Sequence, residues 1–196
     1  MRRPLFCLAA VLVACAIAAT VTGGFASAHT GPGTPSTHFL SVVDGIQPAL
    51  PGVKVAITGR QDPIVLTNGT GRTLTVQGYS AEPYLRFDAR GVWMNLRSPN
   101  RWLDRPGWEA EAKLPAEADP TAPPQWKLLS VGHVWSWHDA RIRWTGAFPT
   151  HIVPKGASRF AARNWEIGLL SIGRLHVLHG TLTYFVHDQP SQRPRD

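Results

Sequence analysis

The middle of the chain alternates apolar and polar residues with a period of two, the pattern of short β-strands with one buried face. Residues 53–57, Val-Lys-Val-Ala-Ile, and residues 74–76, Leu-Thr-Val, show it most cleanly, and residues 64–66 form a short apolar run. Asn68-Gly69-Thr70-Gly71 separates the last two segments and has the composition of a tight turn. We therefore expect residues 64–76 to form a β-hairpin.

A second strand pair is predicted where residues 84–87, Tyr-Leu-Arg-Phe, and residues 92–94, Val-Trp-Met, flank a turn-like Asp-Ala-Arg-Gly. The periodicity then fails over residues 98–124, which are rich in Pro, Ala and Glu. Because proline cannot donate to a sheet ladder, this stretch predicts a long surface loop.

Strand patterning returns over residues 131–137, in which His133, Trp135 and Trp137 share one face. A turn and a short return strand, residues 142–144, follow. The last pattern is a hairpin around Ser171-Ile172-Gly173, and its arms are residues 165–170 and 175–186.

Short strands, Gly/Asn/Asp turns and the lack of a helical period predict an all-β fold. We expect an antiparallel β-sandwich, immunoglobulin-like or similar, with a long Pro-rich loop. Residues 39–188 should form a single domain that carries loop 98–124, and two small β domains split near that loop are the alternative. The Gly- and Pro-rich residues 29–38 predict a flexible leader, and residues 189–196 a disordered tail.

The N-terminus has the order of a secretory signal peptide. Arg2 and Arg3 precede an apolar stretch of 17 residues, Leu5 to Val21, and Ala26-Ser27-Ala28 then offers a cleavage site. Residues 1–28 therefore predict export, with His29 as the new terminus.

Lipid attachment is the alternative to free secretion. Leu12-Val13-Ala14-Cys15 resembles a lipobox, in which Cys15 would be lipidated and become the first residue. No second apolar segment of spanning length follows, so we expect no transmembrane span after signal removal.

Composition narrows the function classes. Both cysteines, Cys7 and Cys15, lie in the signal, which excludes disulfides, Cys-ligated zinc and a Cys nucleophile from the exported part. Residues 29–196 carry 18 Lys plus Arg against 13 Asp plus Glu, a net charge of +5. This charge favours anionic envelope polymers or lipid headgroups, and the absence of a basic run argues against nucleic acid.

Motifs of familiar enzymes are missing from the sequence. It contains no Gly-x-Ser-x-Gly elbow, phosphate-binding loop, His-Glu-x-x-His zinc motif or dinucleotide fingerprint. Carboxylates for acid and base catalysis are available, although their spacing pairs no two of them. They are Glu82, Asp88, Asp104, Glu109, Glu111 and Asp139.

Several residues are candidates for ligand binding. An N-terminal His29 would offer an amine and an imidazole to copper. His133, His138 and Asp139 are further candidate metal ligands around a predicted hairpin end. Arg141 and Arg143, two apart on the return strand, are candidates for clamping an anion. The eight tryptophans favour core packing over a carbohydrate platform.

Three segments carry a family resemblance: Gly-Tyr-Ser-Ala-Glu-Pro-Tyr-Leu-Arg-Phe at residues 78–87, Gly-Val-Trp-Met-Asn-Leu-Arg-Ser-Pro at 91–99, and Trp-His-Asp-Ala-Arg-Ile-Arg-Trp at 137–144. They resemble a family of exported actinobacterial proteins of unassigned function. The third segment resembles Trp-His-Asp-His-Arg-x-His-Trp, but Ala140 and Arg143 replace its later histidines. The resemblance implies compartment and architecture, not mechanism.

The leading prediction is an exported, non-catalytic β-sandwich that binds a ligand or partner of the bacterial envelope. Copper handling is its sharpest version. One rival is a hydrolase of envelope polymers that uses carboxylates such as Glu82, and another is a lipid-anchored scaffold. The sequence does not define an oligomeric state.

Overall fold

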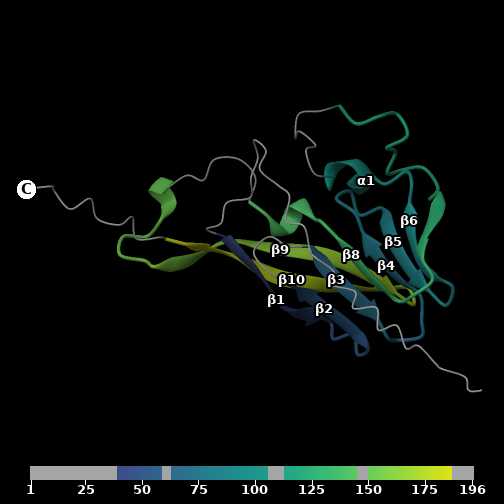
Figure 1. Ribbon diagram of the computed structural model, residues 1–196, viewed down its shortest axis with the longest axis horizontal. Helices are drawn as coiled ribbons and strands as arrows, with labels where there is room; N and C mark the ends of the chain where they lie inside the picture. The colour runs from purple at the N-terminus through teal and green to yellow at the C-terminus, as the bar shows by residue number, and fades with distance from the viewer. Residues whose placement is uncertain (1–38, 59–62, 106–112, 145–149, 187–196) are drawn as a thin grey trace, which may run out of the picture. The chain divides into compact units, whose positions relative to one another are not determined.

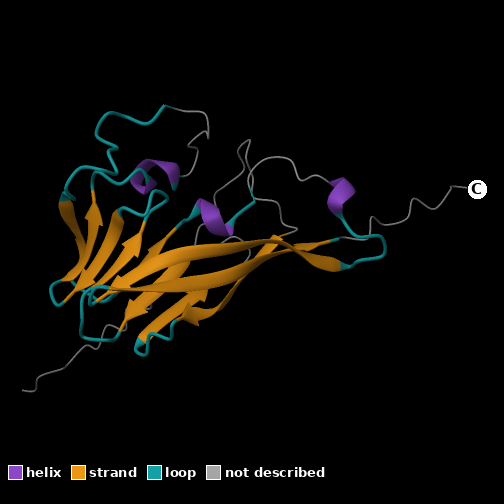
Figure 2. Ribbon diagram, turned by 180° about the vertical axis from the view of Figure 1, so that it is seen from behind, coloured by secondary structure: helices purple, strands orange, loops and turns teal. Residues whose placement is uncertain are grey.

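The computed structural model describes residues 39–58, 63–105, 113–144 and 150–186, which belong to one compact unit. It is a mostly β structure with two antiparallel sheets (Figure 1). The larger sheet has the strand order β1-β10-β9-β4-β5-β6-β7, and the smaller has the order β2-β3-β8. One short α-helix and two 3₁₀ helices lie in the connections (Figure 2).

The strands are β1 (Phe39–Gln47), β2 (Val53–Ile57), β3 (Ile64–Asn68), β4 (Leu74–Gln77), β5 (Pro83–Asp88), β6 (Gly91–Asn95), β7 (Trp126–Ser130), β8 (Val134–Trp137), β9 (Arg159–Ser171) and β10 (Arg174–Phe185). The helices are α1 (Asn100–Leu103), η1 (Ala140–Ile142) and η2 (Thr150–Ile152). No helix in the described ranges is long and apolar enough to cross a membrane.

One hydrophobic core joins the two sheets. Ile64 and Leu66 of β3 pack in the same cluster as Leu74 and Val76 of β4 and Ile167 of β9. These side chains occupy alternate positions of their strands, as the period of two predicts, and all are fully buried. The arrangement is therefore sandwich-like, which confirms the all-β, antiparallel prediction at this level.

The hairpin predicted over residues 64–76 is wrong, because β3 and β4 lie in different sheets. Asn68 and Gly69 do form a turn, in which the Asn68 side chain donates to the Arg72 carbonyl at 2.8 Å. The Gly69 N–H donates to Gly52 of the β1–β2 connection at 2.8 Å. The turn thus carries the chain across the core, and β4 pairs with β5 and β9 instead.

The predicted return strand at residues 142–144 is also wrong. Asp139 caps a 3₁₀ helix over Ala140–Ile142 by accepting a hydrogen bond from the Arg141 N–H at 3.0 Å. The strand predicted over residues 131–137 begins only at Val134, so His133 lies in the preceding turn. Strands β1 and β7 were not predicted.

Strands from both sides of loop 98–124 enter both sheets. β6 precedes the loop and β7 follows it, and the two are paired. The β5–β6 and β9–β10 hairpins agree with the predicted ones.

Candidate functional site

A buried polar network lies where three connections meet beside β5. They are residues 78–82 between β4 and β5, residues 98–104 around α1, and residues 137–141 leading into η1. Each overlaps or adjoins one of the three segments that carry the family resemblance. The network therefore joins parts of the chain that are distant in sequence.

The Tyr79 hydroxyl is the centre of this network. It donates to Asp104 Oδ1 at 2.6 Å and accepts from the Ala140 N–H at 2.7 Å. Asp139 Oδ1 lies 3.5 Å from the same hydroxyl. Burial raises the pKa of Tyr79 well above its usual range, and the charges of Asp139 and Asp104 raise it further. The hydroxyl therefore stays neutral and bridges the two aspartates.

Asp139 is fully buried and is held mainly by Arg141. Arg141 donates from Nε to Oδ1 at 2.9 Å and from Nη2 to Oδ2 at 2.8 Å, a bidentate pair. The Trp137 indole donates to Oδ2 at 3.2 Å. Burial opposes the charge of Arg141, but hydrogen bonding to Asp139 and its negative charge outweigh that effect and raise the pKa of Arg141.

Asp104 is a buried carboxyl group of this network whose pKa is shifted by its surroundings. Burial, followed by the charge of Asp139, raises its pKa from 3.8 to about 6, against the hydrogen bonds from Tyr79 and Asn100. The Asn100 amide donates to Asp104 Oδ2 at 3.0 Å, while its carbonyl oxygen accepts from the Tyr79 N–H at 2.9 Å.

Glu82 forms a second buried cluster next to this one. It accepts from the Ser98 hydroxyl at 2.5 Å and from the Ser80 N–H at 2.9 Å. Gly78 makes this packing possible, since a Cβ there would overlap the Glu82 carboxylate and the Asn100 amide. The β4–β5 pairing shifts register between Val76 and Gln77, so Tyr84 has no cross-strand partner in β4. The Tyr84 side chain is buried.

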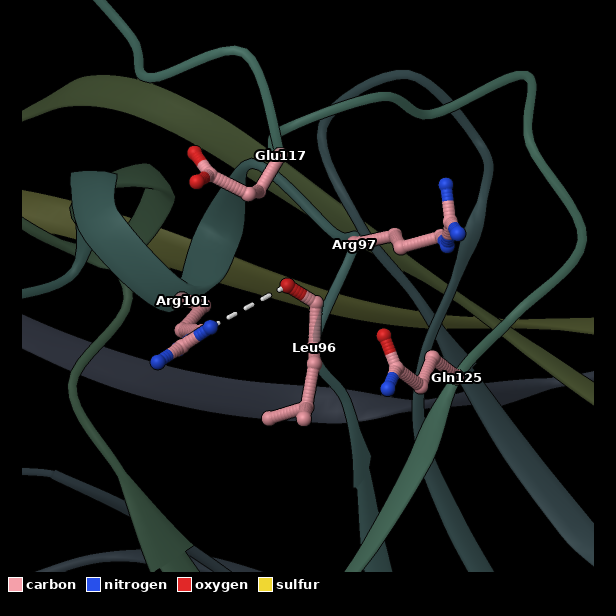
Figure 3. A pocket seen from close by; sticks show the side chains of 5 residues that line it. All are labelled: Leu96, Arg97, Arg101, Glu117 and Gln125. Atoms are coloured by element: carbon pink, nitrogen blue, oxygen red, sulfur yellow. Dashed lines mark hydrogen bonds between the residues drawn. The ribbon is translucent and has the colours of Figure 1, made fainter.

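The three carboxylates are thus buried and bonded to donors of the chain itself. Neither of two surface cavities is lined by them. The smaller, of about 150 Å³, is lined by Leu96, Arg97, Arg101, Glu117 and Gln125. Figure 3 shows the Arg97 and Arg101 guanidinium groups on opposite sides of Leu96, so they do not converge on one point. The buried carboxylates, bonded to their neighbours in the chain, suit a clamp between three connections better than a reaction site.

The predicted metal ligands do not come together. His133 and His138 are exposed, whereas Asp139 is buried against Arg141. Within the described ranges, no group of three or more His, Cys, Asp or Glu side chains is placed to hold a metal ion. His29 lies outside these ranges, so the copper hypothesis that depends on it stays a prediction.

The two predicted anion ligands differ in position. The Arg141 guanidinium is occupied by Asp139 and also donates to the Gln77 carbonyl at 3.2 Å. Arg143 is extended, half-buried and follows η1, and its carbonyl accepts from Arg163 at 2.5 Å. The two side chains therefore do not share a strand face as predicted.

A second candidate region was missed from the sequence: an aligned row on the face of the large sheet that points away from the core. Each member is the cross-strand partner of the next, from β10 across to β7. The members of this outer-face row are Leu175, Leu170, Thr75, Arg86, Trp93 and Leu128. The signal in the sequence was the large apolar residues at the outward positions of β7, β9 and β10.

Arg86 is the centre of the outer-face row. Its guanidinium carbon lies 4.6 Å from the ring centroid of Trp126 and 5.2 Å from that of Trp93. Its Nε lies 3.1 Å from Asp88, which also accepts from the Trp93 indole at 3.0 Å. Arg90 adds a second cation 5.1 Å from the Trp93 centroid. Trp93 and Trp126 are half-buried here, while Trp102, Trp137 and Trp165 are buried, as the core interpretation predicted.

Comparisons with protein-family models, curated proteins and solved structures find no match for this chain. The resemblance to exported actinobacterial proteins therefore stays a prediction.

Proposed function

We propose that the chain is a non-catalytic binding module of the bacterial envelope, exported by residues 1–28, and that the outer-face row with Trp126 is its binding face. The observation that carries the proposal is Arg86, which lies over two half-buried tryptophan rings on the outward face of the large sheet. Trp and Arg are enriched among residues that dominate binding energy. We further propose that the sandwich is immunoglobulin-like. A scaffold anchored to lipid through Cys15, in place of cleavage after Ala28, is the alternative.

The charge of the exported part supports the same function. Residues 29–196 carry a net charge of +5, which complements anionic envelope components. The buried carboxylates support it indirectly, because their oxygens are already bonded within the chain.

Sedimentation of the exported protein with isolated bacterial envelopes tests the proposal. Arg86→Gln and Trp93→Ala should each lower the bound fraction, because each removes part of the Arg86–Trp93 contact. Arg159→Gln, which removes an exposed arginine away from the row, is the matched control. Thermal unfolding would verify that the variants fold, and unchanged sedimentation of both row variants would contradict the proposal.

The hydrolase rival has one observation in its favour, the raised pKa of Asp104. A carboxyl group that titrates near pH 6 is suited to donate a proton near neutrality. If the protein releases soluble fragments from envelope polymers, and a folded Asp104→Asn variant does not, the rival replaces the binding module.

A further inference from the structure

Four connections lie together at one end of the large sheet. β4 begins at Leu74, which pairs with Phe87 near the end of β5 and with Ser171 at the end of β9. Val92, near the start of β6, pairs with Ser130 at the end of β7. The connections that follow or precede these strands therefore share one end (Figure 1). We call residues 69–73, 89–90, 131–133 and 172–174 the turn end.

The turn end combines protruding aliphatic side chains with positive charge. Val131 is 82% exposed and Ile172 is 70% exposed, at the tips of two different connections. Arg72, Arg90 and Arg174 are exposed around them. The residues of the turn end include no Asp or Glu. Asp88 adjoins it at the end of β5 but is paired with Arg86, so positive charge is in excess at the turn end.

Ile172 is also held in an unfavourable backbone conformation. Its φ is 50° and that of the following Gly173 is 70°, as in the type I′ turn of a two-residue hairpin. Asn, Asp or Gly suit the first of these positions, whereas a β-branched side chain with positive φ is strained. Strain of this kind points to a requirement other than stability. The chain therefore places an isoleucine in solvent where a polar residue would fit better.

We propose that the turn end docks on the surface of an anionic lipid bilayer. Val131 and Ile172 would enter the boundary between headgroups and acyl chains, and Arg72, Arg90 and Arg174 would contact the anionic headgroups. The inference rests on the proposed function, because it names lipid as the envelope partner. The outer-face row lies next to this surface, since Arg90 of the turn end lies 5.1 Å from the Trp93 ring centroid.

Lipid suits these features better than an anionic polysaccharide does. Both would attract the three arginines, but only a bilayer gains from single aliphatic side chains on separate tips, because each tip can insert independently. An aliphatic substitution therefore distinguishes the two partners.

The test is sedimentation of the exported protein with vesicles of phosphatidylglycerol and phosphatidylcholine in equal parts. A Val131→Asn/Ile172→Asn variant should bind about tenfold more weakly, because its tips no longer insert. An Arg72→Gln/Arg90→Gln/Arg174→Gln variant should lose about a hundredfold at low salt. Ile152→Asn and Arg159→Gln, which alter exposed residues elsewhere, are the matched controls and should bind as the parent does.

The outcomes separate this inference from the proposed function. Equal binding to pure phosphatidylcholine, or unaltered binding by the Val131/Ile172 variant, overturns docking through the turn end. Binding to isolated envelopes without binding to these vesicles overturns lipid as the partner and leaves the binding module in place. Binding to neither overturns both. Because Asn suits the backbone of residue 172, the variant should stay folded, and its thermal unfolding verifies this.

Discussion

The buried network and the turn end both contain arginine, but in opposite environments. Arg141 is clamped by Asp139 and by the backbone of residues 77 and 78, with a side chain 18% exposed. Arg72, Arg90 and Arg174 are exposed at the turn end, and Arg90 lies over the Trp93 ring. Buried charge is stable only when paired, so Arg141 and Asp139 pair within the network, whereas the arginines of the turn end are exposed to water. Substitutions should therefore affect stability in one region and binding in the other.

The largest expected effect is at Asp139. Asp139→Asn leaves the buried Arg141 charge without its partner and should lower the free energy of unfolding by about 3–5 kcal/mol. Urea denaturation measures this. The control is Asp44→Asn, which removes an exposed carboxylate bonded to Thr181 and should cost below about 1 kcal/mol. Equal losses in the two variants would contradict the clamp.

A pH effect of somewhat smaller size is expected from Asp104. Its pKa in the folded protein is raised to about 6, so the folded state holds a proton that the unfolded state releases near pH 4. Protonated Asp104 therefore adds about 3 kcal/mol to the free energy of unfolding below pH 4. This contribution is lost as the pH rises through 6. Comparing urea denaturation of the parent and of Asp104→Asn from pH 4 to 7 isolates this slope. A constant difference across the range would be inconsistent with a raised pKa.

Tyr79→Phe should have an intermediate effect. It removes the hydroxyl that bridges Asp104 and the Ala140 N–H, and unsatisfied buried groups cost about 1–3 kcal/mol. Because the hydrogen bond from Tyr79 lowers the pKa of Asp104, the variant should also move the pH-dependent loss to higher pH. A stability change below about 0.5 kcal/mol would indicate that the bridge is dispensable.

The smallest effect is expected at the turn end and has the opposite sign. Ile172→Asn should raise the free energy of unfolding by about 1 kcal/mol, because Asn adopts positive φ more readily. Thermal denaturation measures the change, and Ile152→Asn, at an exposed isoleucine elsewhere, is the reference. A loss of stability at residue 172 would mean that this side chain supports the fold after all.

The sequence predicted individual strands better than their partners. The period of two located β2 and β4, since it depends only on which face of a strand is buried. The Asn68-Gly69 turn was visible, but a turn does not specify which sheet the next strand joins. The missed β7 lies directly after the Pro-rich loop and has no clean alternation.

The buried network could not be predicted for a different reason. Tyr79 and Asp104 are 25 residues apart, and Tyr79 and Ala140 are 61 apart. Nothing in the sequence indicates that residues so far apart are in contact. Asp139 was predicted as a metal ligand because its neighbour in sequence is His138, whereas its partner in the structure is Arg141.

The position of β9 and β10 affects when the chain can fold. These two strands separate β1 from β4 in the large sheet, although they follow all the other described strands along the chain. Until they emerge, β1 and one edge of β4 have no partner, and much of the core has no opposite face. The large sheet therefore stays incomplete until β9 and β10 are present. Under the proposed export, a chain that completes its sheet last can pass through the membrane before it folds.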